Sequence, residues 1–152
     1  MALKYGEVTT GNSCIVGPFE VAASEVFKDL SGKYVKMDNN RRLALAGSGD
    51  TEIVGWALTG EITASSSAGQ TKLCVDISTN KVWEIPADDT FTEAELQAMM
   101  FKTCDLIVSN NIQYADIGES NEDVIQIVGG NVERQTLYVR LNPNKICATG
   151  VA

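Results

Sequence analysis

Short apolar runs separated by turn residues constrain this chain more than any other feature. Between residues 33 and 86, β-branched and aromatic runs alternate with clusters of Gly, Asn, Asp and Ser. The clearest runs are residues 52–60 and, after a Ser- and Gly-rich turn, residues 71–77. Runs bounded in this way are typical of strands. We therefore expect a mainly β (α+β) fold, a compact antiparallel β-barrel or sandwich with one amphipathic helix and an extended N-terminal arm.

Turn residues divide the apolar runs into strand–turn–strand units. Each unit has two short runs joined by Asn, Asp, Ser or Gly, which is the pattern of a hairpin. The paired runs are 33–37 with 42–46, 71–77 with 82–85, 104–108 with 112–117, and 124–128 with 135–141. In the last unit the turn is expected at residues 129–131. Pro86 is expected to end its strand, because proline has no N–H to donate to a ladder.

One helix is predicted after residue 90. Thr90 is followed three residues later by Glu93, and Thr92 likewise by Glu95, so either pair can form a capping box. A helix of about three turns, with its apolar side against the sheet, is expected behind the cap. The residues that share this apolar side are Leu96, Met99, Met100 and Thr103.

The length of 152 residues fits one domain with one core. Residues 1–16 have few large apolar groups and are expected to form the extended arm. Residues 17–87 form the β-rich body. Residues 88–142 supply the helix and the strands that complete the same domain, and residues 143–152 form a C-terminal tail.

The charge balance argues against nucleic acid as a partner. The net charge is −8, with 12 basic and 20 acidic residues, and the basic residues are scattered. Nucleic-acid binding neutralises phosphates with clustered Lys and Arg, so no direct contact with nucleic acid is expected. No run reaches the roughly 18 to 20 apolar residues of a membrane helix, so no membrane partner is expected. The first residues lack the apolar core of a secretory signal, which predicts synthesis and retention in a cytoplasm.

The residue types offer little chemistry. The absence of histidine removes Ser-His-Asp triads, Cys-His dyads and histidine metal sites. Acidic side chains near the predicted helix start are expected to favour the helix dipole rather than to form a catalytic pair. These residues are Asp88, Asp89, Glu93 and Glu95. We expect no catalytic residue, cofactor or metal.

The other residues that could bind a metal ion or a sugar have ordinary structural explanations. The loops at residues 38–40 and 119–123 lack the spacing of an EF-hand and are expected to be solvated turns. The four cysteines form no C-x-x-C pair and are expected to be reduced structural thiols. They are Cys14, Cys74, Cys104 and Cys147. Trp56 and Trp83 lie in apolar runs, which favours core packing over a sugar-stacking platform.

Several segments together resemble one family of proteins. They are residues 30–39, 49–50, 53–57, 71–77 and 83–86 in the first half, and residues 102–108 and 135–143 in the second. In pattern and turn placement these segments are similar to the small capsid decoration (cement) proteins of tailed bacteriophages. The resemblance implies a non-enzymatic virion protein on the outer surface of a capsid. Its implied partner is the major capsid protein, with self-association, often as a trimer.

The resemblance also implies that terminal segments lie across neighbouring capsid subunits. The arm residues expected to make such contacts are Leu3, Tyr5, Val8, Ile15 and Val16. Two other classes stay open: a carbohydrate- or host-surface-binding module, or another phage head–tail component. The first would need Trp56, Trp83, Tyr114 or Tyr138 to be exposed together. An enzyme that uses carboxylates or a cysteine is a further alternative, and it would need a cleft with perturbed ionisable groups.

Overall fold

The protein is mainly β, as predicted, with 43% of its residues in strands and 7% in helix. The computed structural model describes residues 6–8 and 12–147. Leu3 and Tyr5 of the predicted arm therefore lie outside the described residues. The described strands form two five-stranded antiparallel sheets and one small two-stranded sheet.

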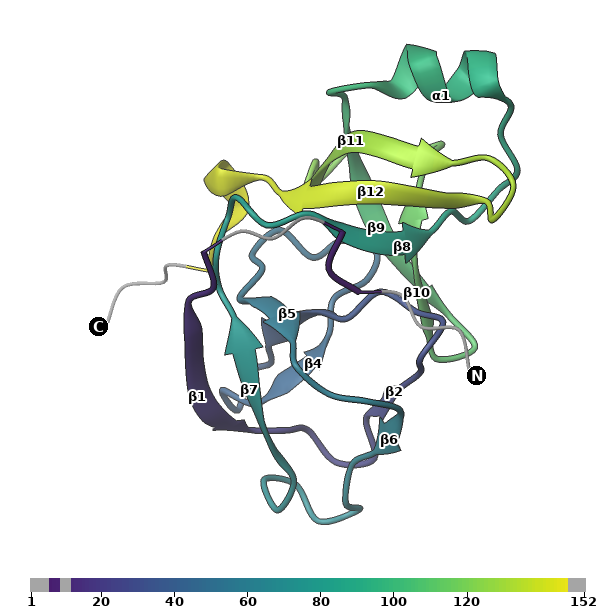
Figure 1. The fold of residues 1–152 in the computed structure, drawn as a ribbon. Helices are drawn as coiled ribbons and strands as arrows, with labels where there is room; N and C mark the ends of the chain where they lie inside the picture. Colours follow the sequence, from purple (N-terminus) through teal and green to yellow (C-terminus); the bar gives the residue numbers. More distant parts are fainter. Residues whose placement is uncertain (1–5, 9–11, 148–152) are drawn as a thin grey trace.

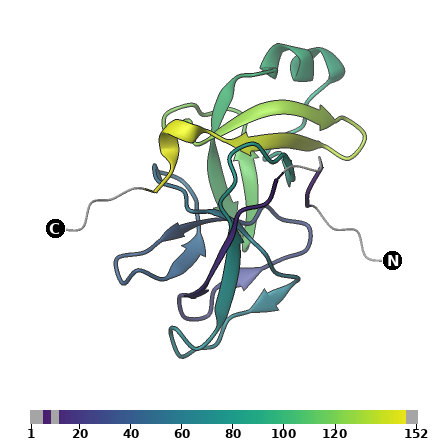
Figure 2. The same cartoon turned by 60° about the vertical axis from the view of Figure 1, so that its left-hand side comes forward.

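The two large sheets lie one above the other in Figure 1, and Figure 2 shows the same arrangement from the side. The lower sheet has the order β1 (Ile15–Glu20), β7 (Lys72–Asp76), β5 (Gly55–Ala57), β3 (Tyr34–Met37) and β4 (Leu43–Leu45). The upper sheet has the order β10 (Ile112–Asp116), β9 (Thr103–Ser109), β11 (Ile125–Asn131), β12 (Thr136–Leu141) and β8 (Trp83–Pro86). The small sheet pairs β2 (Val26–Phe27) with β6 (Ile62–Thr63).

The sheets form a compact sandwich, so the barrel alternative is wrong. Closing a barrel requires a ladder that joins the two edge strands of one sheet. Among the residues that the structure describes, the two edges of the lower sheet meet at a single bridge, between Val21 just after β1 and Leu43 of β4. The outer edge of β8 is followed by residues 6–8, where the Glu84 amide donates to the Gly6 carbonyl and the Val8 amide donates to the Val82 carbonyl. In the upper sheet, Ala87 just after β8 likewise meets Ala115 of β10 at one isolated bridge, so no ladder among the described residues closes either sheet.

The centre of the lower sheet, at β3 and β5, is buried on both faces. Successive side chains of a strand point to opposite faces. Tyr34 and Trp56 therefore pack in the core shared with the upper sheet, while their neighbours Val35 and Ala57 pack in a second core beneath β2 and β6. This arrangement explains why the short runs of β3 and β5 carry almost no exposed residue.

Aromatic rings and one glutamine connect the two large sheets. The rings of Trp56 and Trp83 stack with centroids 4.6 Å apart, and the Tyr34 ring meets Trp56 edge-on at 5.0 Å. The fully buried Gln113 side chain accepts from the Tyr34 amide and donates to the carbonyls of Tyr34 and Ala46. The core-packing prediction for both tryptophans is confirmed.

Three of the predicted strand–turn–strand units are hairpins in the structure: β11 pairs with β12, and the other two also have the predicted turn. β3 pairs with β4, with Leu43 and Leu45 both buried, and β9 pairs with β10 in full register. The first turn is held by the Asp38 carboxylate, which accepts from the amides of Asn40 and Arg42. Short-range turn chemistry was sufficient to predict these units.

The predicted hairpin of residues 71–77 with 82–85 is wrong. β7 pairs with β1 on one side and β5 on the other, whereas β8 pairs with β12 in the upper sheet. Because both edges of β7 are occupied, the chain crosses to the other sheet at residues 77–82. Trp83 therefore lies in the upper sheet, where its ring stacks on Trp56 of the lower sheet.

The predicted turn at residues 129–131 is also wrong. Gly129 and Gly130 lie inside β11, and the chain turns after Asn131. A Cβ atom at Gly129 would lie 2.9 Å from the Tyr138 ring, and one at Gly130 would lie 2.9 Å from Leu96. These glycines therefore permit close packing next to a register shift in the ladder.

The helix α1 (Glu93–Met99) is shorter than predicted, at seven residues. Thr92 and Glu95 form the capping box, while the alternative pair of Thr90 and Glu93 does not. Leu96 packs into the core as predicted, but Thr103 lies in β9. The helix ends at Met100, whose ψ of 129° is not helical, and Phe101 then adopts a left-handed φ of 63°. Figure 1 shows α1 above β11.

Candidate interaction surface

Strand β1 is an edge strand with apolar side chains at the surface. Within the described residues, β7 is the only strand that pairs with β1, and the ladder is irregular between Val16 and Phe19. Ile15 is 57% exposed, which makes it one of the most exposed large apolar side chains described. A free strand edge beside exposed apolar groups is a place where an extended segment of a partner can add.

An apolar groove of about 380 Å³ lies beside β1 and is called the β1 groove. Its walls come from distant parts of the chain, and Arg41 is the charged residue among them. The lining residues are Val16, Phe19, Met37, Arg41, Val54, Ile77, Ile146 and Cys147. The last two belong to the segment after the 3-10 helix Pro143–Lys145, which is fixed beside Ile53 by two backbone hydrogen bonds.

The described residues of the predicted arm fall in two places. Ile15 and Val16 lie in β1, and Val16 lines the β1 groove. Val8 is 41% exposed, but it lies along β8 in the upper sheet. The structure therefore places Val16 in the groove, leaves its neighbour Ile15 exposed on β1, and places Val8 elsewhere. Sequence reasoning missed the other groove residues because nothing local marks Met37, Val54 or Ile146 as neighbours of β1.

A buried ion cluster fixes the start of β1 to the body. Lys81 Nζ lies 2.9 Å from the Asp76 carboxylate, 3.4 Å from Glu7 and 2.5 Å from the Ser13 hydroxyl. The hydrogen bond with Asp76 is the main reason that the pKa of Lys81 is raised. Burial opposes the charge of Asp76, but hydrogen bonds from Ser78 and Lys81 outweigh burial and lower its pKa. The residues before β1 are thus tied to both sheets.

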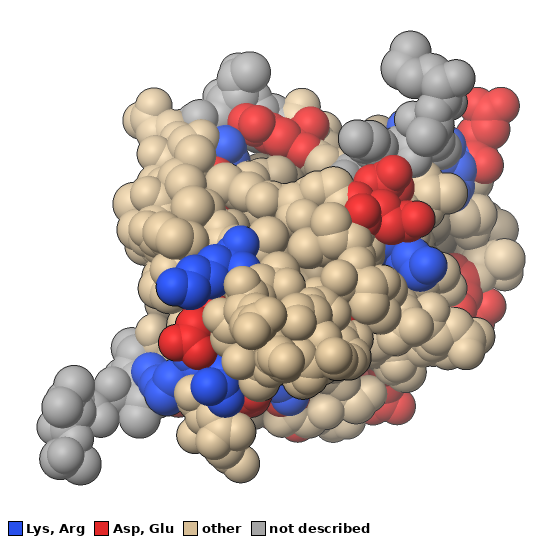
Figure 3. Space-filling model, turned by 90° about the horizontal axis from the view of Figure 1, so that it is seen from below, with Lys and Arg blue, Asp and Glu red and all other residues tan. Residues whose placement is uncertain are grey.

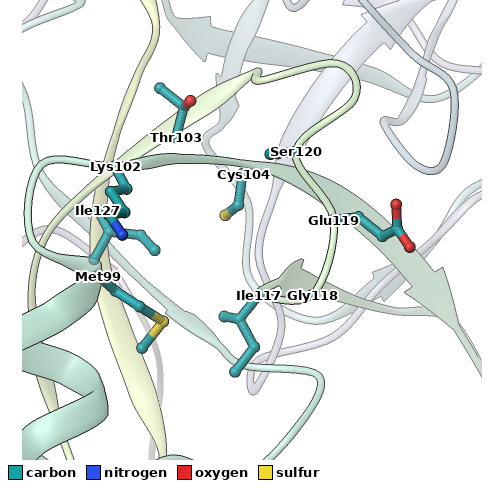
Figure 4. Close-up of a pocket in the computed structure, with 9 residues that line it drawn as sticks. All are labelled: Met99, Lys102, Thr103, Cys104, Ile117, Gly118, Glu119, Ser120 and Ile127. Atoms are coloured by element: carbon teal, nitrogen blue, oxygen red, sulfur yellow. The ribbon is translucent and has the colours of Figure 1, made fainter.

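A second, smaller hollow of about 180 Å³ lies beside β9 and is called the Cys104 pocket. Figure 4 shows Met99, Lys102 and Ile127 on one side of it, and Ile117 and Glu119 on the other. The remaining lining residues are Thr103, Cys104, Gly118 and Ser120.

The Cys104 side chain is suited to packing rather than to nucleophilic chemistry. Cys104 is 3% exposed, and burial together with nearby carboxylates raises the pKa of its thiol. The thiolate is the reactive form of cysteine, so a raised pKa leaves the thiol inert at neutral pH. All four cysteines are free in the structure.

The carboxylates near α1 divide into two groups. Glu93 and Glu95 lie in the first helical turn, where Glu95 completes the cap. Asp88 accepts from the Ile117 amide, and it faces Asp116. Burial and Asp88 raise the pKa of Asp116 to about 6. No cluster of His, Cys, Asp or Glu within the described residues has the arrangement of a metal site.

The aromatic groups considered for sugar stacking do not form a platform. Trp56 and Trp83 are 3% and 5% exposed, and Tyr114 and Tyr138 are half-buried. The two tryptophans are thus unavailable for stacking on a sugar ring at the surface.

Charged side chains are dispersed on the face drawn in Figure 3. This face covers β2, β6 and the lower ends of β1 and β7 in Figure 1. Lys and Arg lie next to Asp and Glu around a broad uncharged area, and no basic stripe crosses this face. Two of the ion pairs in the lower sheet join Arg42 to Glu20 and Lys36 to Asp50.

Comparisons with known proteins give no relative. No family model matches the chain, and neither a curated protein nor a solved structure matches it significantly. Within residues 6–8 and 12–147, no helix has the length and apolar character needed to cross a bilayer.

Proposed function

We propose that this chain is a non-enzymatic virion protein that binds the outer surface of a bacteriophage capsid. Its partner is the major capsid protein, and binding stabilises the shell across the seams between subunits. The resemblance described above supplies the class of partner. The observation that carries the proposal is the free edge of β1, on which Ile15 is exposed and Val16 lines the β1 groove.

The surface suits an extended apolar segment of a neighbouring protein. Such a segment can donate and accept backbone hydrogen bonds along β1, as in strand addition. Its apolar side chains can enter the β1 groove, whose walls are mostly Val, Phe, Met and Ile. A segment held in this way at a seam adds apolar contact and strand pairing, both of which raise the energy needed to open the shell.

The side-chain chemistry supports a non-enzymatic function. The sequence has no histidine, and the Cys104 thiol has a raised pKa. The raised pKa of Asp116 has an ordinary cause, since a second carboxylate faces it at the protein surface. The ion pairs of the described residues hold turns and strands together rather than lining a common cleft.

Co-sedimentation with capsids tests the proposal. The purified chain is mixed with expanded capsids stripped of this protein, and with unexpanded shells for comparison. We expect saturable binding to expanded shells at a fixed ratio to the major capsid subunit, together with greater resistance of the shell to heat. Binding to neither form would overturn the proposal and favour a head–tail component or a host-surface module.

Substitution of Ile15 tests the proposed surface. Ile15→Lys places a charge on the exposed edge of β1, and we expect capsid binding to weaken about tenfold or more, as for an anchor residue. Leu30→Lys is the matched control, because Leu30 is also exposed (43%) but lies in a turn away from β1. Equal binding by the two variants would exclude β1 as the contact.

Point substitutions are a better test than removal of the arm. Deleting the residues before Gly17 would remove Ile15 and Val16 from β1 and take Glu7 and Ser13 away from the buried Lys81. Loss of binding by the truncated chain would then report loss of structure as well as loss of contact.

A further inference from the structure

Phe101 is an exposed aromatic residue in a strained conformation. It is 68% exposed, and its φ of 63° is unusual for a bulky residue. The conformation is held on both sides, since the Phe101 amide donates to the Ile127 carbonyl and its carbonyl accepts from the Gln126 side chain. Strain of this kind is a reason to look for function at the residue that carries it.

The Cys104 pocket lies directly beside Phe101. Met99 and Lys102, close to Phe101 on either side in the sequence, both line the pocket, and so does Ile127, which binds the Phe101 amide. The apolar part of the lining comes from Met99, Cys104, Ile117 and Ile127. Apolar cavities of about 150 Å³ accommodate benzene, so a hollow of about 180 Å³ has room for a phenyl ring.

The charges around the pocket are opposite in sign. Lys102 and Glu119 are both exposed, and Figure 4 shows them on opposite sides of the hollow. Exposed Phe101, a hollow large enough for a ring, and one charge of each sign therefore lie close together in the fold. A surface of this kind is self-complementary, because a two-fold axis brings each group against its counterpart in a second copy.

We propose that this face joins two copies of the chain around a two-fold axis, with each Phe101 ring in the other copy's Cys104 pocket. Lys102 of each copy then faces Glu119 of the other. An exposed aromatic residue that enters an apolar pocket is the usual anchor of such interfaces. This surface lies in the upper sheet and does not involve β1, so the inference does not rest on the proposed function. It differs from the trimer that the resemblance implies, since a cyclic trimer needs two different surfaces on each copy.

Analytical ultracentrifugation of the full chain over a concentration series tests the inference. We expect a monomer–dimer equilibrium. Phe101→Asn removes the ring at a position whose left-handed φ suits Asn, and it is expected to raise the dimer dissociation constant about tenfold or more. Leu30→Asn, a change at an exposed residue outside this face, is the control and should leave the constant unchanged.

Charge reversal tests the orientation of the two copies. Lys102→Glu and Glu119→Lys are each expected to weaken the dimer, because like charges then meet across the interface. The double variant is expected to restore most of the lost affinity. A chain that stays monomeric, forms trimers, or dimerises equally well with Phe101→Asn would overturn the inference. So would a double variant as weak as the two single changes combined. Thermal unfolding of each variant identifies any loss of affinity caused by misfolding.

Discussion

At the scale of single residues, the facing carboxylates of Asp88 and Asp116 make stability depend on pH. Burial is the larger cause, and the charge of Asp88 the next, of the rise in the pKa of Asp116 from 3.8 to about 6. Glu119 adds to the rise, while a hydrogen bond from the Gly118 amide opposes it. The folded protein therefore holds this proton more tightly than the unfolded chain does. Stability contributed by Asp116 falls as the pH rises from about 4 to about 6.

Asp116→Asn is expected to remove this decline. The variant should unfold at a higher urea concentration than the wild type at pH 7, because it carries no charge against Asp88. Near pH 4 the two proteins should be similar, since Asp116 is then largely protonated in the wild type. Urea unfolding followed across this range measures the effect. Asp89→Asn is the control, because Asp89 is exposed and instead accepts from the Thr90 amide. A parallel pH profile for Asp116→Asn and wild type would contradict the prediction.

At the scale of elements, α1 depends on its cap more than a longer helix would. The first four amides of a helix have no intrahelical partner. In a helix of seven residues, these are most of its amides. The Thr92 hydroxyl accepts from the Glu95 amide, and the Glu95 carboxylate accepts from the Thr92 amide. Leu96 is the helix residue that is buried. Packing on one side and one capping box therefore hold the helix.

Thr92→Ala is expected to cost about 1 kcal/mol of the free energy of unfolding, the usual value for loss of such a cap. Thr90→Ala serves as the comparison, because the sequence allows a second capping box at Thr90 and the structure does not form it. Chemical denaturation of both variants measures the difference. Equal losses at the two positions would show that the helix begins differently in solution.

At the scale of the whole molecule, the two large sheets share one core. Trp56 comes from β5 in the lower sheet and Trp83 from β8 in the upper sheet, and their rings lie parallel within 6°. Gln113 of β10 adds hydrogen bonds to backbone groups of the lower sheet. Separating the sheets would expose these rings and leave the backbone groups of Tyr34 and Ala46 without their side-chain partner. We therefore expect the sheets to unfold together.

Single-tryptophan variants test this cooperativity. Trp56→Phe leaves Trp83 as the reporter of the upper sheet, and Trp83→Phe leaves Trp56 as the reporter of the lower sheet. Each variant is expected to be less stable than the wild type, since the replacement is smaller than the ring it replaces. Within each variant, fluorescence and far-ultraviolet circular dichroism should give the same urea midpoint. Separate midpoints would show that the sheets unfold independently.

Local sequence patterns accounted for much of the fold. The Asp38 turn and the alternating leucines of β4 were sufficient for one hairpin, and the two Thr/Glu pairs located the helix start to one of two positions. The candidate surface was predicted less well. Ile15 and Val16 were identified, but the groove they adjoin contains Met37, Val54 and Ile146, whose proximity depends on the packing of separate strands. Phe101 was not singled out, because neither its exposure nor its backbone conformation can be inferred from its neighbours in the sequence.

The sequence by itself determined most of the strand segments, two candidate positions for the helix start and that the protein is mainly β. Those properties depend on side-chain alternation, turn residues and caps, all of which act over a few residues. Tertiary structure alone decided that β7 and β8 lie in different sheets, that Gly129 and Gly130 lie inside a strand, and that β1 keeps a free edge. Strand pairing depends on which edges other strands have already occupied, and a close approach between backbones depends on residues far apart in the chain.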